Sequence, residues 1–279
     1  MSEFLNSSSR AKKKLSVLAV GTSQVVLSFE ALKAADFDLP CKDEQDKIAS
    51  FFECLNRRIE YQRTLVDALK KYKRGVVRTL LTPDSCCIAD ATWTTAKIGD
   101  LGSFTKGAPL SKADISPDGT PFILYGELYT TYHEVINAVI RRTQAQPEKQ
   151  YYSRVGDVII PTSGETPEEI STAACVMLPD IILAGDLNIF RGSKIDGRIM
   201  SYILNHIVNG QIARIAQGKS VVHIQASELS KIEISYPDYN TQCKMISVFE
   251  TIATRIKSVE NELTYLRTMQ NALSQQLFI

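Results

Sequence analysis

No apolar stretch of the sequence approaches the ~20 residues that a membrane-spanning helix needs, so we expect no span and no membrane partner. The six cysteines show neither the paired spacing of a zinc site nor that of a redox motif, and the three histidines are scattered. Glycine-rich phosphate loops and cofactor fingerprints are missing as well. The sequence therefore predicts free thiols, a cytoplasmic protein, no metal site and no cofactor.

The chain also lacks a surplus of either charge. It has 32 Lys and Arg against 31 Asp and Glu, a net charge of +1 over 279 residues. A nucleic-acid binder usually has a basic surplus, so this balance argues at first against one. The charge is unevenly spread, however: the net is +1 for 1–40, +4 for 41–81, −4 for 82–237 and zero for 238–279. Bulk charge is therefore not a test of nucleic-acid binding here.

An internal repeat organises the sequence. A shift of 197 residues aligns 21–81 with 218–278 without a gap and gives thirteen identities. Two unrelated amphipathic helices would share apolar positions, but they would not also share glycine, proline and glutamine outside the helical period. The repeat therefore indicates two copies of one structural unit. The identical pairs are Gly21/Gly218, Ser23/Ser220, Val25/Val222, Leu32/Leu229, Pro40/Pro237, Gln45/Gln242, Lys47/Lys244, Phe52/Phe249, Glu53/Glu250, Arg58/Arg255, Ile59/Ile256, Leu69/Leu266 and Leu80/Leu277.

Both copies have the same predicted order of elements. An alternating stretch, as in 232–236, predicts a half-buried strand. Pro40 or Pro237 then ends the strand, because proline cannot extend a hydrogen-bonded ladder. Polar residues that suit a helix N-terminus follow, and a long helix completes the unit.

The two long helices carry a coiled-coil pattern. Spacings of three and four alternate from Ile48 to Leu80 and from Met245 to Leu277, which is typical of a heptad seam about 50 Å long. One interpretation is that each seam packs on its own domain. We favour antiparallel pairing of the two helices, because a compact domain lies between them in the sequence. The predicted interface residues are Ile48, Phe52, Leu55, Ile59, Leu69, Phe249, Ile252, Ile256, Leu263 and Leu266.

The segment 82–237 has the pattern of a mixed domain. Short apolar runs bounded by glycine, proline and aspartate predict strands near 92–98, 121–125 and 156–161. An amphipathic helix is predicted at 198–215. The predicted fold class is α+β, with one β-rich mixed domain and two long helices forming an antiparallel coiled coil.

The motifs in this order carry a resemblance. Two Pro-x4-Gln-x-Lys units, each opening a long helix, flank a domain that contains TPFILYGELY at 120–129, GDVIIPTSGET at 156–166 and GKSVVHI at 218–224. Over nearly the whole chain, this order resembles the specificity subunit of a type I restriction-modification system.

The resemblance implies a set of roles. Such subunits have two target-recognition domains, each contacting one half of a bipartite site in double-stranded DNA. Their paired helices act as a spacer and dock methyltransferase (M) subunits, and restriction/translocase (R) subunits join the complex. The methyl donor binds to the M subunit, and the specificity subunit itself is not an enzyme.

The sequence departs from this family in having one intact recognition domain, 82–237. Residues 1–40 match only the tail of another such domain, while 41–81 and 238–279 match the two helices. The chain therefore resembles a half-length or truncated form. A homodimer with a palindromic site, assembly with another chain, and a non-functional cassette remnant all stay open.

Several polar residues of 82–237 suit DNA contact. Lysine and arginine would position the duplex through phosphates, while tyrosine and glutamate would specify bases, since a carboxylate can accept from cytosine N4. A solvated or structural role is the alternative for each one. The candidates are Lys106, Lys112, Tyr125, Tyr129, Arg141, Arg142, Ser163 and Glu165.

Intrinsic catalysis is not expected. Ser163 lacks the Gly-x-Ser-x-Gly spacing of a nucleophile elbow, and the nearby glutamates have no histidine beside them. The duplicated helices also argue against an unrecognised enzyme. They do not separate a DNA-specificity subunit from a coiled-coil adaptor that binds only the methyltransferase.

Overall fold

The structure is a computed structural model that describes residues 9–19, 26–36, 40–216 and 222–277. The chain divides into two compact units. One unit consists of residues 72–251, and the other combines residues 1–71 with 252–279. The first is rich in strands and the second is helical, so the predicted α+β class is confirmed.

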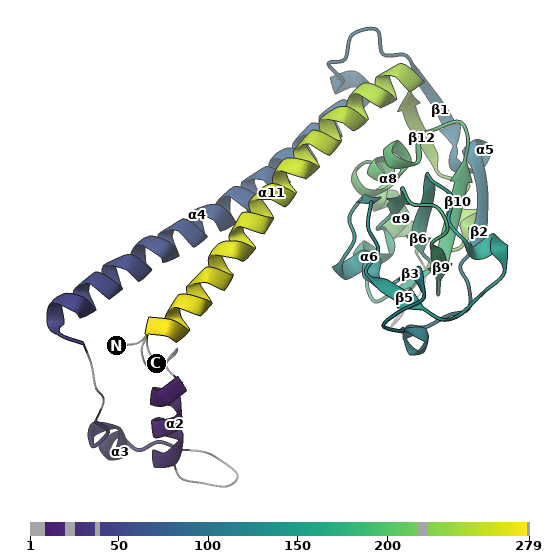
Figure 1. Cartoon of the computed structure of the whole chain (residues 1–279). Helices are drawn as coiled ribbons and strands as arrows, with labels where there is room; N and C mark the ends of the chain where they lie inside the picture. Colours follow the sequence, from purple (N-terminus) through teal and green to yellow (C-terminus); the bar gives the residue numbers. More distant parts are fainter. Residues whose placement is uncertain (1–8, 20–25, 37–39, 217–221, 278–279) are drawn as a thin grey trace. The chain divides into compact units, whose positions relative to one another are not determined.

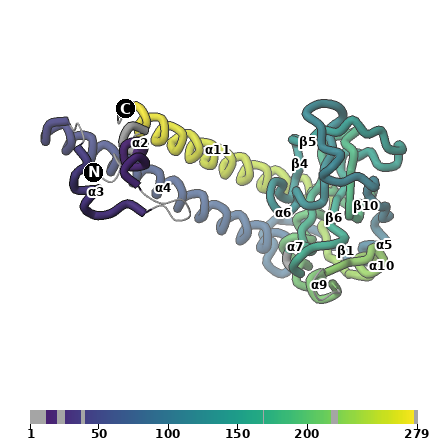
Figure 2. The backbone as a smooth tube through the Cα atoms, turned by 90° about the horizontal axis from the view of Figure 1, so that it is seen from below, coloured from purple at the N-terminus to yellow at the C-terminus, as the bar shows by residue number. Residues whose placement is uncertain are grey.

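Two long helices repeat one another. Helix α4 (Lys42–Leu80) and helix α11 (Tyr239–Leu277) each contain 39 residues, and the shift of 197 carries the bounds of one onto those of the other. They run side by side (Figures 1 and 2). Contacts between their side chains join Asn56 to Gln270, Arg58 to Glu262 and Lys70 to Glu260. Residue numbers thus rise along one helix as they fall along the other, which confirms the antiparallel pairing.

The predicted interface residues lie on the inner face of these helices. Phe249 differs from the rest because it belongs to the hydrophobic core of unit 72–251, where its ring centroid lies 4.6 Å from that of Tyr202. The buried members are Phe52, Leu55, Phe249, Ile256 and Leu266, and the half-buried members are Ile48, Ile59, Leu69, Ile252 and Leu263.

A glutamine clamps the start of each long helix. The Gln45 amide donates to the carbonyl of Pro40, and the Gln242 amide donates to the carbonyl of Pro237, each at 2.8 Å. This bond is the physical reason for the repeated Pro-x4-Gln spacing. In the second copy, Asp238 also accepts from the backbone N–H of Thr241 at 3.1 Å, so it caps the first turn.

The repeat extends a little upstream of the long helices. The same shift of 197 residues aligns helix α3 (Phe29–Lys33) with helix α10 (Ala226–Leu229). Helix α2 (Ser9–Leu18) precedes α3 in the chain. The strand predicted before Pro40 lies mostly outside the described residues. The matching strings 21–24 and 218–221 lie entirely outside the described residues.

A five-stranded sheet forms the centre of unit 72–251. Its strand β10 pairs antiparallel with both β2 and β6, and β4 joins at the edge parallel to β8. Strands β6 and β8 are buried along their length, because apolar runs in a covered sheet face the core on both sides. The order is β2 (Gly102–Lys106), β10 (Leu187–Gly192), β6 (Asp157–Pro161), β8 (Ala174–Val176) and β4 (Val135–Ile136).

Three smaller sheets complete this unit. Strand β1 pairs with β12 in register Trp93 to Pro237, so Pro237 is the last residue of its strand, as predicted. The other two small sheets also join segments that lie far apart in the sequence. The three small sheets consist of β1 (Trp93–Lys97) with β12 (Glu233–Pro237), of β3 (Thr120–Leu124) between β5 (Arg141–Thr143) and β9 (Ile182–Ala184), and of β7 (Ser163–Gly164) with β11 (Val222–His223).

The helix predicted over 198–215 is wrong as one element. The structure has α8 (Gly197–His206) followed by α9 (Asn209–Ile215). The carbonyl of Ile203 accepts from both Ile207 and Val208, which ends α8. The Asn205 side chain is fixed to the backbone of Ala173 at 2.7 Å and 3.1 Å, so the residue just before strand β8 holds this break in place.

Candidate nucleic-acid interface

Four of the eight predicted DNA contacts come together in space. Lys106 ends β2, Tyr125 follows β3, Tyr129 lies on α6 (Glu127–Thr130), and Ser163 begins β7. Tyr125 and Ser163 contact the turn at Gly185 and Asp186 between β9 and β10, Tyr129 bonds to Ser163, and Lys106 lies opposite Asn188 on β10. We call Lys106, Tyr125, Tyr129 and Ser163 the tyrosine cluster.

The two tyrosines of the cluster are held against each other. Their ring centroids lie 6.4 Å apart with the rings nearly perpendicular. The Tyr129 hydroxyl donates to the carbonyl of Ser163 at 2.6 Å. Burial, and after it the charge of Glu169, raises the pKa of Tyr129, so this hydroxyl stays neutral and keeps its proton for donation.

Ser163 has a structural bond of its own. Its side chain is buried, and its hydroxyl donates to the carboxylate of Asp186 at 2.8 Å. A contact from this hydroxyl to DNA would require that bond to be given up. Beside it, Gly185 has φ +79, and a Cβ there would lie 3.0 Å from the Tyr125 ring. Glycine at this turn thus permits the close approach of the tyrosine.

Asn188, a residue that no sequence motif singled out, holds the side chain of Lys106 in place. The Lys106 ammonium group donates to the side-chain oxygen of Asn188 at 2.9 Å. Asn188 is fully buried, and its amide donates in turn to the carbonyl of Ile224 at 3.2 Å. Only the pairing of β2 with β10 brings Asn188 and Lys106 into register, so neither Asn188 nor Asp186 could be predicted to support the cluster.

Arg141 and Arg142 lie together on β5, away from the five-stranded sheet. Among the described strands, β5 pairs only with β3, and its outer side forms one isolated bridge, from Arg142 to Ser116. The Arg141 guanidinium donates to the buried carboxylate of Glu127 at 3.1 Å, and Arg142 donates to the carbonyl of Gly119 at 2.8 Å. Both arginines are exposed, and anchored guanidinium groups at an edge suit phosphate contacts.

The remaining two candidates join neither group. Lys112 is exposed in the short 3-10 helix η2 (Lys112–Asp114), which Ser111 caps. Glu165 is exposed in the turn before α7 (Pro167–Ile170), where its backbone N–H donates to the Glu169 carboxylate at 2.9 Å. Contact of either residue with DNA stays a prediction.

Several carboxylates of the acidic segment 82–237 form ion pairs with cations of the same unit. Three of these four cations belong to the segment itself and are already counted in its net charge of −4, so the pairs place the charge without removing it. Only Lys73 comes from outside the segment, and the negative charge of 82–237 stays an objection to DNA binding. The ion pairs are Glu134 with Lys73, Glu127 with Arg141, Asp157 with Arg191, and Asp196 with Arg198.

The pair of Lys73 and Glu134 also explains a polar residue in the heptad seam. Lys73 stands at a seam position of α4 and donates to Glu134 at 2.7 Å, while His206 contacts the other carboxylate oxygen at 2.8 Å. The side chains of all three are only 11–13% exposed. The Lys73 ammonium also lies 5.4 Å from the centre of the Tyr202 ring. This end of α4 is thus fastened to the domain by a buried charged network.

In the described part of the chain, no group of three or more His, Cys, Asp or Glu side chains is placed to hold a metal ion. No described helix combines the length and the apolar content that crossing a bilayer requires.

Comparison with known proteins gives consistent results. The family described as "Type I restriction modification DNA specificity domain" matches residues 91–275. No curated protein matches the sequence. The fold is similar to the HsdS subunit from Thermoanaerobacter tengcongensis, with TM-score 0.55, 15% identity, and coverage of 99% of this chain and 68% of that one.

A second solved structure has the same fold. It is the type I restriction-modification system S subunit from M. genitalium, with TM-score 0.61 and 16% identity. The alignment covers 99% of this chain and 72% of that chain. At these identities the structures show a shared fold, and the family match carries the assignment.

Proposed function

The chain belongs to the type I restriction modification DNA specificity family, and from this premise we propose how its residues perform that role. It is a DNA sequence-specificity subunit of a type I restriction-modification system. The domain at 82–237 contacts one half-site of double-stranded DNA. The tyrosine cluster contacts bases, and the arginines of β5 contact phosphates.

One observation supports this proposal most directly. Lys106 and Tyr129 are both fixed by hydrogen bonds to neighbouring strands before any ligand binds. Polar side chains that are already ordered lose little rotamer entropy on binding, which favours specific recognition. Tyr125, half-buried beside the Gly185 turn, adds a planar surface to the same cluster.

The partners follow from the two long helices. We place methyltransferase subunits on them and restriction/translocase subunits beyond those, with adenine methylation carried out by the methyltransferase. The chain itself contributes no catalytic group and no cofactor site. A second half-site requires a second recognition domain, supplied by a homodimer or by another specificity chain.

The proposed division of the chain assigns a role to each segment. Residues 1–40 correspond to the tail of a recognition domain, 41–81 and 238–279 are the helical arms, and 82–237 is the recognition domain. Arms of about 50 Å exceed one turn of B-DNA, which repeats about every 34–36 Å. The arms are thus long enough to hold two recognition domains a fixed distance apart, with bases between the half-sites that neither domain contacts.

An adaptor or cassette remnant that binds only the methyltransferase is the second candidate. The observation that favours it is the net charge of −4 over 82–237, because phosphate contacts supply most DNA affinity and need cations. Of the ion pairs described above, only that of Glu134 with Lys73 offsets a charge of this segment from outside it.

Mapping of methylated adenines in cells with and without the gene tests the proposal. Loss of a gapped motif with the gene supports a specificity subunit, and a palindromic gapped motif supports a homodimer. If no motif is lost, the adaptor candidate is favoured. The variant Arg141→Ala/Arg142→Ala should reduce methylation of the motif, whereas Lys231→Ala, at an exposed surface ion pair, should not.

A further inference from the structure

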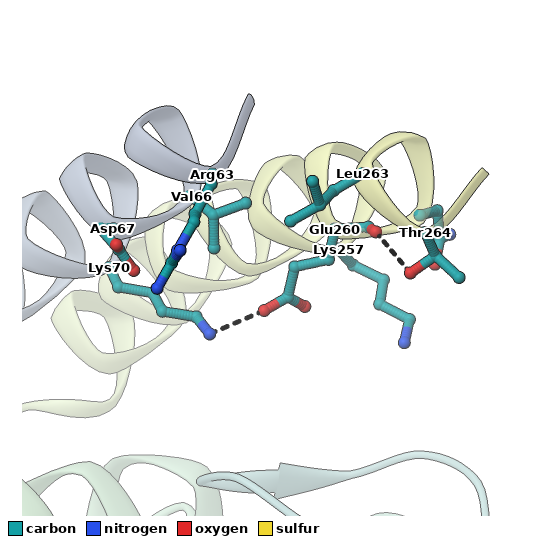
Figure 3. A pocket seen from close by; sticks show the side chains of 9 residues that line it. Arg63, Val66, Asp67, Lys70, Lys257, Glu260, Leu263 and Thr264 are labelled. Atoms are coloured by element: carbon teal, nitrogen blue, oxygen red, sulfur yellow. Dashed lines mark hydrogen bonds and ion pairs between the residues drawn. The ribbon is translucent and has the colours of Figure 1, made fainter. Parts of the chain in front are cut away.

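Lys106 is held in place by a group that carries no net charge. Lys70 on the long helices provides the contrast, because it pairs with the Glu260 carboxylate at 2.8 Å beside a groove of about 410 Å³ (Figure 3). Each of those two charges is offset by its partner. The Lys106 ammonium group instead donates to an amide oxygen, that of Asn188, at 2.9 Å. This bond orients the ammonium group and leaves its positive charge in place.

The support of Lys106 also determines how many donors it can offer. Asn188 is fully buried, and its amide nitrogen donates to the carbonyl of Ile224, so its oxygen is the atom that faces Lys106. An ammonium group has three N–H donors, and Asn188 accepts from one of them. Because Lys106 is exposed, the other two can be presented to a ligand from a fixed position.

A carboxylate lies next to the support of Lys106. Asp186 is exposed in the turn between β9 and β10, two residues before Asn188, so the Cα atoms of these two residues are at most about 7 Å apart. The backbone N–H of Thr162 donates to the Asp186 carbonyl at 2.8 Å, and that of Ile224 donates to the Thr162 carbonyl at 3.0 Å. Asp186 and Lys106 thus belong to one hydrogen-bonded assembly.

The Asp186 carboxylate can accept further hydrogen bonds. It accepts from the Ser163 hydroxyl at 2.8 Å, whereas an ionised carboxylate has about four lone-pair sites on its two oxygens. Lys106 and Asp186 together therefore present two N–H donors beside carboxylate oxygens. We call these two residues the donor–acceptor pair.

The surroundings of the donor–acceptor pair do not suit a phosphate. Burial is the main cause that raises the pKa of Tyr129, and the charges of Glu169 and Asp186 add to it, so both carboxylates act on this part of the cluster. A phosphate bound to Lys106 would approach these negative charges and be repelled. A neutral base would not be repelled, so the surroundings favour contact with a base edge.

The base pairs of DNA differ in the donors and acceptors that they present in the major groove. Guanine presents two adjacent acceptors, N7 and O6, and its cytosine partner presents the N4 amino donor. In an A·T pair, the adenine N6 amino donor lies beside N7, where it would oppose the second donor of an ammonium group. Two donors beside an acceptor therefore match a G·C pair and mismatch an A·T pair.

We propose that Lys106 and Asp186 together select one G·C base pair of the half-site. The Lys106 ammonium group donates to guanine N7 and O6, and the Asp186 carboxylate accepts from the N4 amino group of the paired cytosine. This inference rests on the proposed function, which supplies DNA as the ligand. It adds Asp186 to the residues that contact bases, and it gives one acid of the segment 82–237 a direct role in DNA binding.

Mapping of the methylated motif with variants of the full chain tests the proposal. Lys106→Met and Asp186→Asn should relax the motif at the same single G·C position, and every other position should stay required. Lys106→Arg should keep the requirement for guanine, because arginine also donates to N7 and O6. The matched controls Lys149→Met and Asp180→Asn change exposed residues of the same unit and should leave the motif unaltered.

Binding of the complex of this chain with its methyltransferase subunits gives the magnitude. The probes are DNA duplexes that carry the mapped motif, with either the selected G·C pair or an A·T pair at that position. The unmodified complex should bind the G·C duplex about 5- to 150-fold more tightly. Lys106→Met should reduce this preference to less than about threefold, whereas Lys149→Met should keep it. Thermal unfolding of each variant checks that the fold is retained.

The outcomes separate the proposal from its premise. If deletion of the gene removes no methylated motif, the proposed function itself fails. If a motif is lost but its half-site requires no G·C pair, the donor–acceptor pair has been misassigned, whether or not the variants fold. If Lys106→Met weakens binding to all duplexes equally and lowers the salt dependence by about one phosphate contact, Lys106 contacts a phosphate and the proposal is overturned. The same conclusion follows if Asp186→Asn relaxes a different position or none.

Discussion

Replacing Glu134 by glutamine should destabilise the domain that contains it by about 3–4 kcal/mol. Lys73 would keep its charge at a site where only 13% of its side chain is exposed. Removing one member of a buried ion pair costs about 3–5 kcal/mol, because the other charge is left without compensation. The Tyr202 ring beside Lys73 offsets part of this by roughly 0.5–1 kcal/mol.

Urea and thermal unfolding of the full chain measure this change. For a unit of this size, each 1 kcal/mol lowers the Tm by about 2–4 °C, so a decrease of roughly 6–16 °C is expected. The matched control is Glu228→Gln, which removes a surface pair with Lys231 at the same 2.7 Å distance. Its expected cost is below about 0.5 kcal/mol, since exposed pairs are weak.

The double variant Lys73→Met/Glu134→Gln separates the charge from the shape of the site. It should recover part of the stability lost by Glu134→Gln alone, because the uncompensated cation is gone. The reasoning would be refuted by a loss below about 1 kcal/mol for Glu134→Gln, or by costs of the two substitutions that simply add.

Three further predictions concern the pH dependence of stability, the glutamines at the start of the long helices and the reactivity of the cysteines. Burial alone raises the pKa of Glu134, but the hydrogen bond from His206 and the charge of Lys73 outweigh it, and the pKa lies below its ordinary 4.5. Such a carboxylate stabilises the fold above its unfolded pKa, so stability should fall below about pH 5, and less steeply in Glu134→Gln. The substitution Gln242→Leu should cost about 1–3 kcal/mol in urea unfolding, because Gln242 is buried, whereas Gln45→Leu at a half-buried site should cost less. Burial raises the pKa of Cys175, so mass spectrometry after native alkylation should find it unlabelled while Cys54 is modified.

The long helices could be predicted closely because their signal is local and periodic. Heptad spacing and the repeated Pro-x4-Gln unit require no knowledge of the rest of the chain, and α4 and α11 confirm both. The break after His206 was missed, since it depends on Asn205 bonding to Ala173, 32 residues away. A local periodic pattern contains no information about a hydrogen bond to so distant a residue.

The candidate site could likewise be predicted only in part from the sequence. Tyrosine, lysine and arginine were recognisable by residue type, but their supports were not. Asp186 reaches Ser163 across 23 residues, and Asn188 reaches Lys106 across 82. A sequence identifies side chains suited to DNA, whereas sheet pairing decides which of them are held ready and which, like Ser163, are buried.

The polar positions in the heptad seam restrict how the two long helices can align. Gln62 is 2% exposed and donates to Glu262, and Gln270 donates to Asn56. Sliding one helix by a heptad would separate the buried Gln62 amide from Glu262 and leave it among apolar neighbours, at a cost that an all-leucine seam would not incur. Gln62 therefore favours a single axial alignment of the two helices and with it a single length for the arm.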